Sequence, residues 1–464
     1  MTHNLKVTHK MKQLALDVKK LETQLAQCTS CGMCQANCPL FAQTKKEADV
    51  SRGKIALING LILEIFEDAK GVDERLQKCL LCGSCAYGCP SNVNTIDIFL
   101  KARSIIAQYQ KLPFLQKIIF KNHLGKPAEF NTTIDKLTCF QKFFFKNQNN
   151  LQGTSCARIT SPVLRNRNIV PLKNQSFNKT FKGEDLKIDG TGLKIAFFTG
   201  CLIDKIYPDI AHSAVDVLKH FNAQIFIPIN QGCCGIPAIA AGDIKTFETL
   251  VKTNIKLFLK HDCDYLVTAC ATCTSTIKNL WPSLLQNQDK DLLQQIEKLA
   301  LKTVDISWLM EKHFDLSSAI LEKSKKPDIN SDTKSDTKEI ITYHDPCHLK
   351  KSLGVFKEPR KVIQACNYEL REMVESDTCC GMGGSFNLKY YDISSKIGLQ
   401  KAQNIIDTKC SIVATSCPAC MMQISDMLAK LNHSINVKHP VQIYAKALRT
   451  CLTESDKSHR NLTS

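Results

Sequence analysis

Apolar residues in the first quarter of the chain recur at helical spacing. Leu14, Val18, Leu21 and Leu25 lie three or four residues apart, which places their side chains on one face of a helix. Apolar-rich stretches with few helix-breaking residues return twice before residue 111. We therefore expect three N-terminal helices, over residues 1–25, 51–70 and 94–110.

Beyond residue 190 the pattern changes to short apolar runs that alternate with helical stretches. The runs IAFF, QIFIPI and YLVTA are rich in β-branched and aromatic residues, which favour strands. Helical stretches over 210–221 and 243–260 separate these runs. Strands that alternate with helices are typical of α/β units on a parallel sheet.

This part of the chain is a tandem duplication. KIAFFTG before Cys201 corresponds to IITYHDP before Cys347, and each copy continues with Cys-Cys-Gly and then a CxxC pair. Six pairs of cysteines match at an offset of 146 or 147 residues: Cys201/Cys347, Cys233/Cys379, Cys234/Cys380, Cys263/Cys410, Cys270/Cys417 and Cys273/Cys420. One inserted residue accounts for the change in offset. The repeat predicts two copies of one α/β domain.

The composition of the chain indicates the compartment in which these domains work and a role for their cysteines. The chain has 464 residues, enough for several domains, and no run of 18 apolar residues that would predict a membrane-spanning helix. Its first 20 residues lack the apolar core of a signal peptide, so we expect a cytoplasmic protein. Disulfides are rare in that compartment, and metal binding is the leading explanation for 24 cysteines.

The first eight cysteines form two runs of identical spacing, CxxCxxCxxxCP. This is the bacterial ferredoxin spacing, in which three thiolates wrap one [4Fe–4S] cube and the fourth ligates the other cube. The spacing predicts one cluster on Cys28, Cys31, Cys34 and Cys89, and a second on Cys79, Cys82, Cys85 and Cys38.

Zinc is the alternative for these eight cysteines, because paired CxxC units also bind zinc. Two complete runs, each ending in Cys-Pro, favour iron–sulfur clusters. Gly32 and Gly83 leave room for the backbone to approach a cluster closely.

Each copy of the duplicated domain supplies a lone cysteine, an adjacent pair and a CxxC pair. These cysteines follow predicted strands, so we expect them to converge at strand ends, where open α/β sheets place their sites. Adjacent cysteines suit neighbouring irons of a cluster better than one tetrahedral zinc. A cysteine-lined core without metal is the alternative.

Several other residues have plainer explanations. Cys263 and Cys410 lie beside predicted strands, and core packing accounts for them. His344 and His348 flank Cys347, where we expect capping or hydrogen bonding rather than ligation. Cys139, Cys156, Cys366 and Cys451 follow no pattern and have no assigned role. The sequence has no dinucleotide fingerprint after a strand and no P-loop, so we expect neither flavin nor NAD on this chain.

Much of the net charge of +17 is concentrated in one region. Residues 101–190 hold 16 Lys and Arg against 5 Asp and Glu, a surplus of 11, and include Phe140, Phe143, Phe144 and Phe145. We expect the basic segment 125–190 within this region to dock to an acidic partner or, peripherally, to the anionic inner face of the membrane. A solvated basic linker is the alternative. No recognised nucleic-acid-binding fold accompanies the charge, so nucleic acid is not an expected partner.

Two ferredoxin motifs followed by two CCG repeats resemble the iron–sulfur subunit of glycolate oxidase and D-lactate dehydrogenase. The repeats also resemble the CCG domains of the heterodisulfide reductase catalytic subunit and of the anaerobic glycerol-3-phosphate dehydrogenase iron–sulfur subunit. HDPCH around Cys347 supports the resemblance. The resemblance implies that each copy can hold a five-cysteine [4Fe–4S] cluster. The implied ligands are Cys201, Cys233, Cys234, Cys270 and Cys273 in the first copy, and Cys347, Cys379, Cys380, Cys417 and Cys420 in the second.

The expected fold is therefore a multidomain α+β and α/β protein: an N-terminal helical ferredoxin-like domain with two [4Fe–4S] clusters, followed by two duplicated α/β CCG domains. The expected divisions are a ferredoxin-like domain (1–124), a basic linker (125–190), the first CCG domain (191–322), a polar linker (323–338), the second CCG domain (339–452) and a tail (453–464).

The resemblance implies an iron–sulfur electron-transfer subunit of a glycolate or D-lactate dehydrogenase. A partner flavoprotein would oxidise the 2-hydroxy acid, and this chain would pass electrons singly toward a quinone or other acceptor. At least one copy, with the second favoured, would hold a cluster needed for electron exit. Both copies retain their CxxC pairs, which favours an alternative: a subunit that itself reduces a disulfide or heterodisulfide, or one of the glycerol-3-phosphate type.

Overall fold

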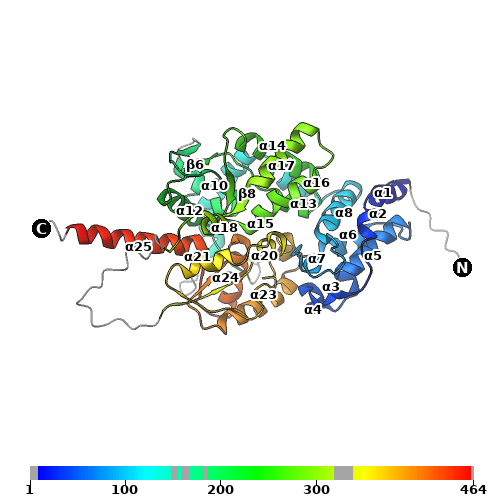
Figure 1. Cartoon of the computed structure of the whole chain (residues 1–464). Helices are drawn as coiled ribbons and strands as arrows, with labels where there is room; N and C mark the ends of the chain where they lie inside the picture. Colours follow the sequence, from blue (N-terminus) through cyan, green and yellow to red (C-terminus); the bar gives the residue numbers. More distant parts are fainter. Residues whose placement is uncertain (1–8, 148–154, 158–166, 182–184, 318–337, 461–464) are drawn as a thin grey trace.

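A computed structural model describes residues 9–147, 155–157, 167–181, 185–317 and 338–460. Figure 1 shows the N-terminal helices at one end, the two copies of the duplicated domain beside each other, and the last helix extending from the opposite end. Among the described residues, none of the helices combines the length and apolar character needed to cross a bilayer. The elements divide into a helical part and two sheet-containing parts.

The N-terminal part is a helical bundle around two cysteine-rich loops. Its elements are α1 (His9–Lys19), α2 (Glu22–Leu25), α3 (Met33–Ala36), α4 (Pro39–Thr44), the 3₁₀ helix η1 (Glu47–Asp49), α5 (Ser51–Ile62), α6 (Lys70–Gln77), α7 (Ser84–Tyr87) and α8 (Thr95–Gln110). Helix α1 packs on α5 and α8, and Leu14 and Val18 are buried there. This burial is what the three- and four-residue spacing predicts.

Two of the three expected N-terminal helices are shorter than expected. Residues 9–25 form α1 and α2 with a break after Lys19, and residues 1–8 lie outside the described part. Helix α5 ends at Ile62, and Glu64 then adopts a left-handed conformation (φ 54°), which a right-handed helix cannot continue through. Helix α8 confirms the third, and Asn94 caps it by accepting the Asp97 backbone N–H.

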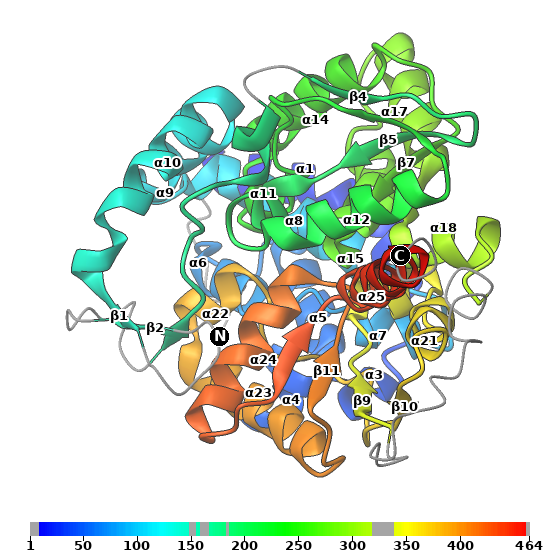
Figure 2. The same ribbon diagram turned by 90° about the vertical axis from the view of Figure 1, so that its left-hand side faces the viewer.

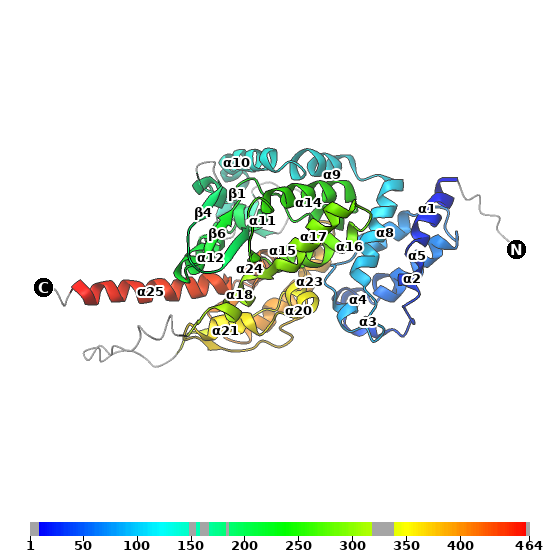
Figure 3. The same cartoon turned by 45° about the horizontal axis from the view of Figure 1, so that its top comes forward.

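The basic region that follows α8, up to residue 190, contains helices and strands where it is described. Its elements are α9 (Phe114–Ile118), the π-helix η2 (Ile119–Leu124), α10 (Pro127–Phe144), the antiparallel strands β1 (Phe145–Asn147), β2 (Ser155–Ala157) and β3 (Asn168–Ile169), and the 3₁₀ helix η3 (Phe177–Phe181). Helices α9 and α10 run along the outside of the first copy (Figure 3). Arg167 then donates to the Asn387 carbonyl (2.8 Å), which ties this segment to the second copy.

The predicted docking role of the basic segment stays a prediction. The side chains of Phe140, Phe143, Phe144 and Phe145, and residues 148–154, 158–166 and 182–184, lie outside the described residues. The linker expected over 323–338 falls almost wholly on residues 318–337, which are also outside them.

The first copy is a five-stranded sheet with helices on its faces. Its strands are β4 (Leu186–Ile188), β5 (Lys194–Phe198), β6 (Gln224–Ile227), β7 (Tyr265–Thr268) and β8 (Thr303–Asp305), in the order β4-β6-β5-β7-β8. Its helices are α11 (Gly200–Lys205), α12 (Pro208–His220), α13 (Ile236–Ala240), α14 (Ile244–Phe258), α15 (Ala271–Ser275), the π-helix η4 (Thr276–Leu280), α16 (Trp281–Leu284), α17 (Lys290–Lys302) and α18 (Ile306–His313). All strand pairs are parallel except β4–β6, which confirms the expected α/β units.

The second copy is a four-stranded parallel sheet. Its strands are β9 (Ile340–Tyr343), β10 (Glu369–Leu370), β11 (Ile412–Ala414) and β12 (Asn436–Lys438), in the order β10-β9-β11-β12. Its helices are α20 (Cys347–Leu353), α21 (Glu358–Gln364), α22 (Ser385–Lys389), α23 (Tyr391–Ile406), α24 (Pro418–Lys430) and α25 (Pro440–Arg460). Helix α25 continues beyond residue 452 into the expected tail.

Once β4 is set aside, both sheets have the same strand order: second, first, third, fourth. The duplication read from the sequence is therefore present in the fold. In such sheets the order reverses between the first and third strands, and ligands bind outside their carboxyl ends at that point. Cys201 and Cys270 follow the first and third strands of the first copy, and Cys347 and Cys417 follow those of the second.

The two copies pack against each other reciprocally. Helix α12 of the first copy packs on α25 of the second, and α21 of the second packs on α18 of the first. The cysteine-bearing helices repeat this exchange, with α15 against α20 and α11 against α24. The Ala271 backbone N–H donates to the Ser416 carbonyl (2.9 Å) where the copies meet. Figure 2 shows the two sheets on either side of this junction. The carboxyl ends of both sheets therefore face one another.

Arg103 of α8 joins the helical bundle to the first copy. Its side chain is 1% exposed, and its guanidinium donates to the carbonyls of Leu76 and, at 2.6 Å, Ala240. Gly242 allows this close approach, because a Cβ there would lie 2.6 Å from the Arg103 carbonyl oxygen. A buried arginine thus satisfies carbonyls on both sides of the domain junction.

Replacing Arg103 with leucine removes the donor that these buried carbonyls use. An unpaired buried acceptor costs about 1–3 kcal/mol, so we expect Arg103→Leu to lower the free energy of unfolding by at least about 2 kcal/mol. Urea denaturation followed by circular dichroism measures this loss. The control is Lys252→Leu, which removes only an exposed i,i+4 ion pair with Glu248, an interaction of about 0.3–0.5 kcal/mol. Equal losses in the two variants would contradict the bridging role of Arg103.

Candidate metal centres

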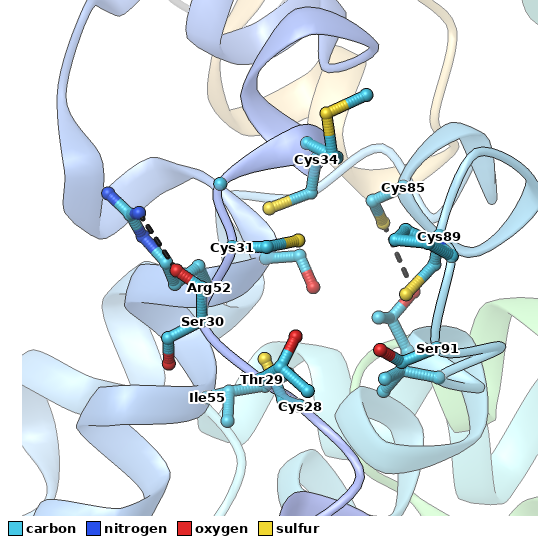
Figure 4. A pocket seen from close by; sticks show the side chains of 16 residues that line it. Cys28, Thr29, Ser30, Cys31, Cys34, Arg52, Ile55, Cys85, Cys89 and Ser91 are labelled. Carbon is cyan, nitrogen blue, oxygen red and sulfur yellow. Dashed lines mark hydrogen bonds between the residues drawn. The ribbon is translucent and has the colours of Figure 1, made fainter.

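The first cavity in the helical bundle collects thiols from both ferredoxin motifs. Its lining includes Cys28, Cys31, Cys34 and Cys89, and also Cys85 of the second motif, which lines the second cavity as well. Figure 4 shows the sulfur atoms of the first four around a common space. Gly32 has φ +84° before α3, a left-handed conformation that favours glycine and turns the loop between Cys31 and Cys34. The structure thus brings Cys89 to the first motif, as the crossed assignment expects.

A second cavity collects the remaining thiols. It is lined by Cys38, Cys79, Cys82 and Cys85. Burial raises the pKa of the Cys38 thiol to about 11 and that of Cys85 to about 12. Cys79 and Cys82 are among the charged neighbours of both thiols. A buried thiol with a raised pKa holds its proton until a metal replaces it.

A basic side chain lies beside each cavity. Arg52 donates to the Ser30 carbonyl (3.1 Å) at the first cavity, where Cys34 and Cys31 are its sulfur neighbours. Lys54 is 1% exposed, lines the second cavity and faces Cys79 and Cys38. Burial lowers the pKa of Lys54, and these thiols act against that shift. Four thiols beside a buried cation fit a negatively charged iron–sulfur cluster better than a neutral core.

Cys82 connects the helical bundle to the second copy. Cys82 lies beside Cys347 and Cys379, and these two neighbours lower the pKa of its thiol. Neighbouring polar contacts hold the same junction: His348 Nε2 lies 3.0 Å from the Leu81 carbonyl oxygen, and Lys351 Nζ donates to Ser84 Oγ at 2.7 Å. The second cavity therefore abuts the cysteines of the second copy.

An apolar cluster surrounds this junction. Its buried members come from both sides: Leu40, Leu80, Cys347, Cys379, Phe386 and Ile397. Gly383 allows the close packing, because a Cβ there would lie 2.8 Å from the Leu80 side chain. The cluster excludes water from the contact between Cys82 and the second copy.

The five cysteines of the second copy converge, as the sequence predicts. Cys379 lies beside Cys347 and Cys380, Cys380 lies beside Cys420, and Cys420 lies beside Cys417. All five are buried. Lys401 is 2% exposed and faces Cys347, Cys380 and Cys379. The surroundings again pair buried thiols with a buried cation.

The five cysteines of the first copy form a matching group. Cys201 Sγ lies 3.8 Å from Cys233 Sγ, Cys234 contacts Cys233 and Cys273, and Cys273 contacts Cys270. Lys205 is the buried cation nearby, but it pairs with Asp204 (3.0 Å) and Asp135 (3.4 Å). The position of Lys401 corresponds to Asn254 here, a neutral residue that donates to the Cys233 carbonyl (3.0 Å). The two copies thus match in thiols and differ in charge.

The two groups meet where the copies pack together. Cys270 of the first copy and Cys417 of the second lie beside each other, and Thr272 Oγ1 lies 3.5 Å from Cys417 Sγ. Ten thiols of the duplicated domains and Cys82 therefore form one uninterrupted run of contacts, which we call the thiol run. Its order is Cys82, Cys347, Cys379, Cys380, Cys420, Cys417, Cys270, Cys273, Cys234, Cys233 and Cys201.

The other cysteines and histidines singled out in the sequence lie outside the thiol run or beside it. Cys263 and Cys410 are buried outside the thiol run, next to Lys302 and the Ile405 carbonyl respectively. Both nitrogens of His348 have partners, Thr272 Oγ1 and the Leu81 carbonyl, which suits the expected hydrogen-bonding role. The sequence reasoning missed Lys54, Lys401 and the Cys82 contact. Aligning the repeat beyond its cysteines would have singled out Lys401 opposite Asn254.

Comparisons with known proteins match three separate parts of the chain. Residues 24–93 match the family model described as "4Fe-4S dicluster domain", and residues 195–278 and 341–425 each match the one described as "Cysteine-rich domain". The chain thus has a domain for two [4Fe–4S] clusters and two cysteine-rich domains that allow further clusters. The matched residues include the eight cysteines of the ferredoxin motifs and all eleven cysteines of the thiol run.

Similar curated proteins include three with informative names. The probable glycolate oxidase iron-sulfur subunit of Bacillus subtilis (strain 168) is 27% identical over 89% of this chain and 92% of its own length. A fumarate reductase (CoM/CoB) subunit of Methanothermobacter marburgensis is 27% identical over 89% of this chain and 69% of its own length. Lactate utilization protein A 2 of Bacillus cereus (strain AH820) is 28% identical over 55% of this chain and 99% of its own length.

The crossed assignment makes a pairwise prediction about single cysteine substitutions. We expect Cys38→Ser to change the paramagnetic resonance spectrum of the reduced full chain as Cys79→Ser does, because both thiols line the second cavity. Cys89→Ser should instead match Cys31→Ser, because these line the first. Spectra of anaerobically purified variants, normalised to assayed iron and sulfide, make the comparison. If Cys38→Ser matches Cys31→Ser, the assignment is wrong.

Proposed function

This chain belongs to the oxidoreductase-type iron–sulfur subunit family that joins two ferredoxin motifs to two CCG domains, and we propose that it carries electrons for a 2-hydroxyacid dehydrogenase. A partner flavoprotein oxidises glycolate or D-lactate, and this chain delivers the electrons toward a quinone or other acceptor. Clusters held by the two ferredoxin motifs and by the two five-cysteine groups supply one-electron redox carriers.

The observation that carries this proposal is the thiol run. It begins at Cys82 in the ferredoxin part and reaches Cys201 through both copies, and each cysteine lies beside the next one in the run. A protein that used its ferredoxin domain and its duplicated domains separately would have no need to join them thiol to thiol. The run supports one continuous conduit through three domains.

The solvent exposure of residues at the two ferredoxin sites differs, and this difference supports a direction of electron flow through the chain. Cys31 at the first cavity is exposed, and Met33 and Tyr87 beside the cysteine loops are 53% and 60% exposed. The second cavity instead abuts the buried junction with the second copy. The first site therefore suits contact with the donor protein, and the second suits transfer into the chain.

Buried lysine side chains at the second cavity and in the second copy would stabilise the negative charge of a cluster. Lys54 faces the second cavity and Lys401 faces the second copy, each at most 2% exposed. In a poorly solvated interior a cation stabilises an added electron more strongly than it does in water. The apolar cluster around Leu80 and Phe386 keeps water out of this part of the path.

A second candidate function is reduction of a disulfide at the junction of the copies. A cavity of about 260 Å³ lies there, lined by Tyr207, Met421, Lys173 and Lys438 among others. The Tyr207 hydroxyl is buried without a hydrogen-bond partner among the described residues, and Cys417 is its charged neighbour. Retention of the CxxC pair in both copies also favours this candidate. Lys173 and Lys438 outnumber Asp209 in the lining, so a small anionic disulfide, or the acceptor of the first candidate, would suit this cavity.

Isolation of the chain from its native cells, by an affinity tag under anaerobic conditions, tests the proposal. We expect flavin to co-purify on a partner, and glycolate or D-lactate to reduce the iron–sulfur signals of the complex. The double substitution Cys379→Ser with Cys380→Ser should leave the ferredoxin signals reducible and abolish reduction of an artificial quinone, because it interrupts the thiol run.

The matched control is Cys263→Ser with Cys410→Ser, which removes two buried thiols outside the run and should leave quinone reduction unchanged. Reduction of the signals by a dithiol, with none by either hydroxy acid, would favour the disulfide-reducing function instead. Quinone reduction that survives the Cys379 and Cys380 substitutions would contradict the conduit.

A further inference from the structure

His344 occupies a distinctive place in the second copy, directly after strand β9. It is fully buried, and its backbone N–H continues the ladder to the Ala414 carbonyl (2.9 Å). A ring nitrogen of His344, Cys380 Sγ and Cys420 Sγ all lie within 4.8 Å of one another. A histidine and two cysteines at such separations can bind one metal ion.

Contacts on the other side of the ring decide which nitrogen is available. His344 Nδ1 lies 3.1 Å from the Ser376 carbonyl oxygen, so Nδ1 carries a proton and donates it there. That carbonyl is itself held by the Asp345 backbone N–H (3.0 Å), and Arg360 fixes the Asp345 carboxylate with two contacts of 2.8 and 2.9 Å. In the neutral ring, Nε2 is then the nitrogen with the free lone pair.

Nε2 is a buried polar atom without a hydrogen-bond partner among the described residues. Its lone pair lies close to Cys380 and Cys420, two thiols that become anions when they bind metal. An unprotonated nitrogen opposite anionic sulfur is unfavourable unless a cation lies between them. Imidazole nitrogen is a common metal ligand, and a second hydrogen bond such as that to Ser376 orients it for this role.

We propose that His344 Nε2 is a metal ligand of the second copy, beside Cys380 and Cys420, so that this site is a mixed cysteine–histidine iron site. The inference rests on the second copy holding iron, as the proposed function has it, and adds a ligand beyond its five cysteines.

The first copy lacks the equivalent ligand. Phe198 stands where the second copy has His344, at the same offset of 146 residues that relates Cys201 to Cys347. A neutral imidazole adds a donor nitrogen to the site without adding negative charge, so the two sites share their thiols and differ in this ligand. The second copy, which has this additional ligand, is also the copy that lies beside Cys82.

Nitrogen hyperfine spectroscopy of the full chain tests this ligation directly. The chain is produced anaerobically with ¹⁵N-histidine, iron is assayed, and pulsed paramagnetic resonance is recorded on the reduced second-copy site. We expect a strongly coupled ¹⁵N signal in the unsubstituted chain. His344→Phe, which installs the residue of the first copy, should lose this signal.

His348→Gln is the matched control, because both nitrogens of His348 already have protein partners and its loss should leave the coupling unchanged. His344→Gln is a second variant, should phenylalanine disturb folding, and should also lose the signal. Iron in the second copy with only weak nitrogen coupling would overturn His344 ligation and leave the proposed function standing. Absence of iron from the second copy would overturn both.

Discussion

Burial of many neighbouring thiols in one continuous group is the constraint on which the rest of the structure depends. A thiolate in a poorly solvated interior is unfavourable unless a metal ion or a cation neutralises it. The eleven cysteines of the thiol run belong to three domains, so they meet only if all three dock at one place. The reciprocal helix packing of the copies, the Arg103 bridge and the apolar cluster at Leu80 are the contacts that hold this docking.

Duplication supplies the symmetry of this arrangement, and a few substitutions break it. Equal strand order brings the carboxyl ends of both sheets to one junction, where Cys270 meets Cys417. The same thiols then have different neighbours: Lys401 in the second copy corresponds to Asn254 in the first, and His344 corresponds to Phe198. Two sites built from one pattern thereby acquire different charge, which is a physical basis for different roles in electron transfer.

Periodicity and spacing predicted most of the fold and the composition of each site. The helical face of Leu14 and Val18, the strands before Cys201 and Cys347, and the convergence of the five cysteines in each copy all follow from local pattern. Helix ends did not: the end of α5 depends on the backbone conformation of Glu64.

Contacts between domains were also beyond the sequence. The Cys82 contact with the second copy depends on how two domains dock, and no spacing within either motif encodes it.

The central claim is that clusters in the helical bundle and in both copies form one path for electrons. Iron K-edge anomalous diffraction from crystals of the anaerobically purified full chain tests this claim most directly. The account predicts four separate clusters of iron: one in each cavity of the helical bundle and one in each copy, the last two on the cysteines of the thiol run. Iron confined to the helical bundle, with metal-free thiols in both copies, would contradict it.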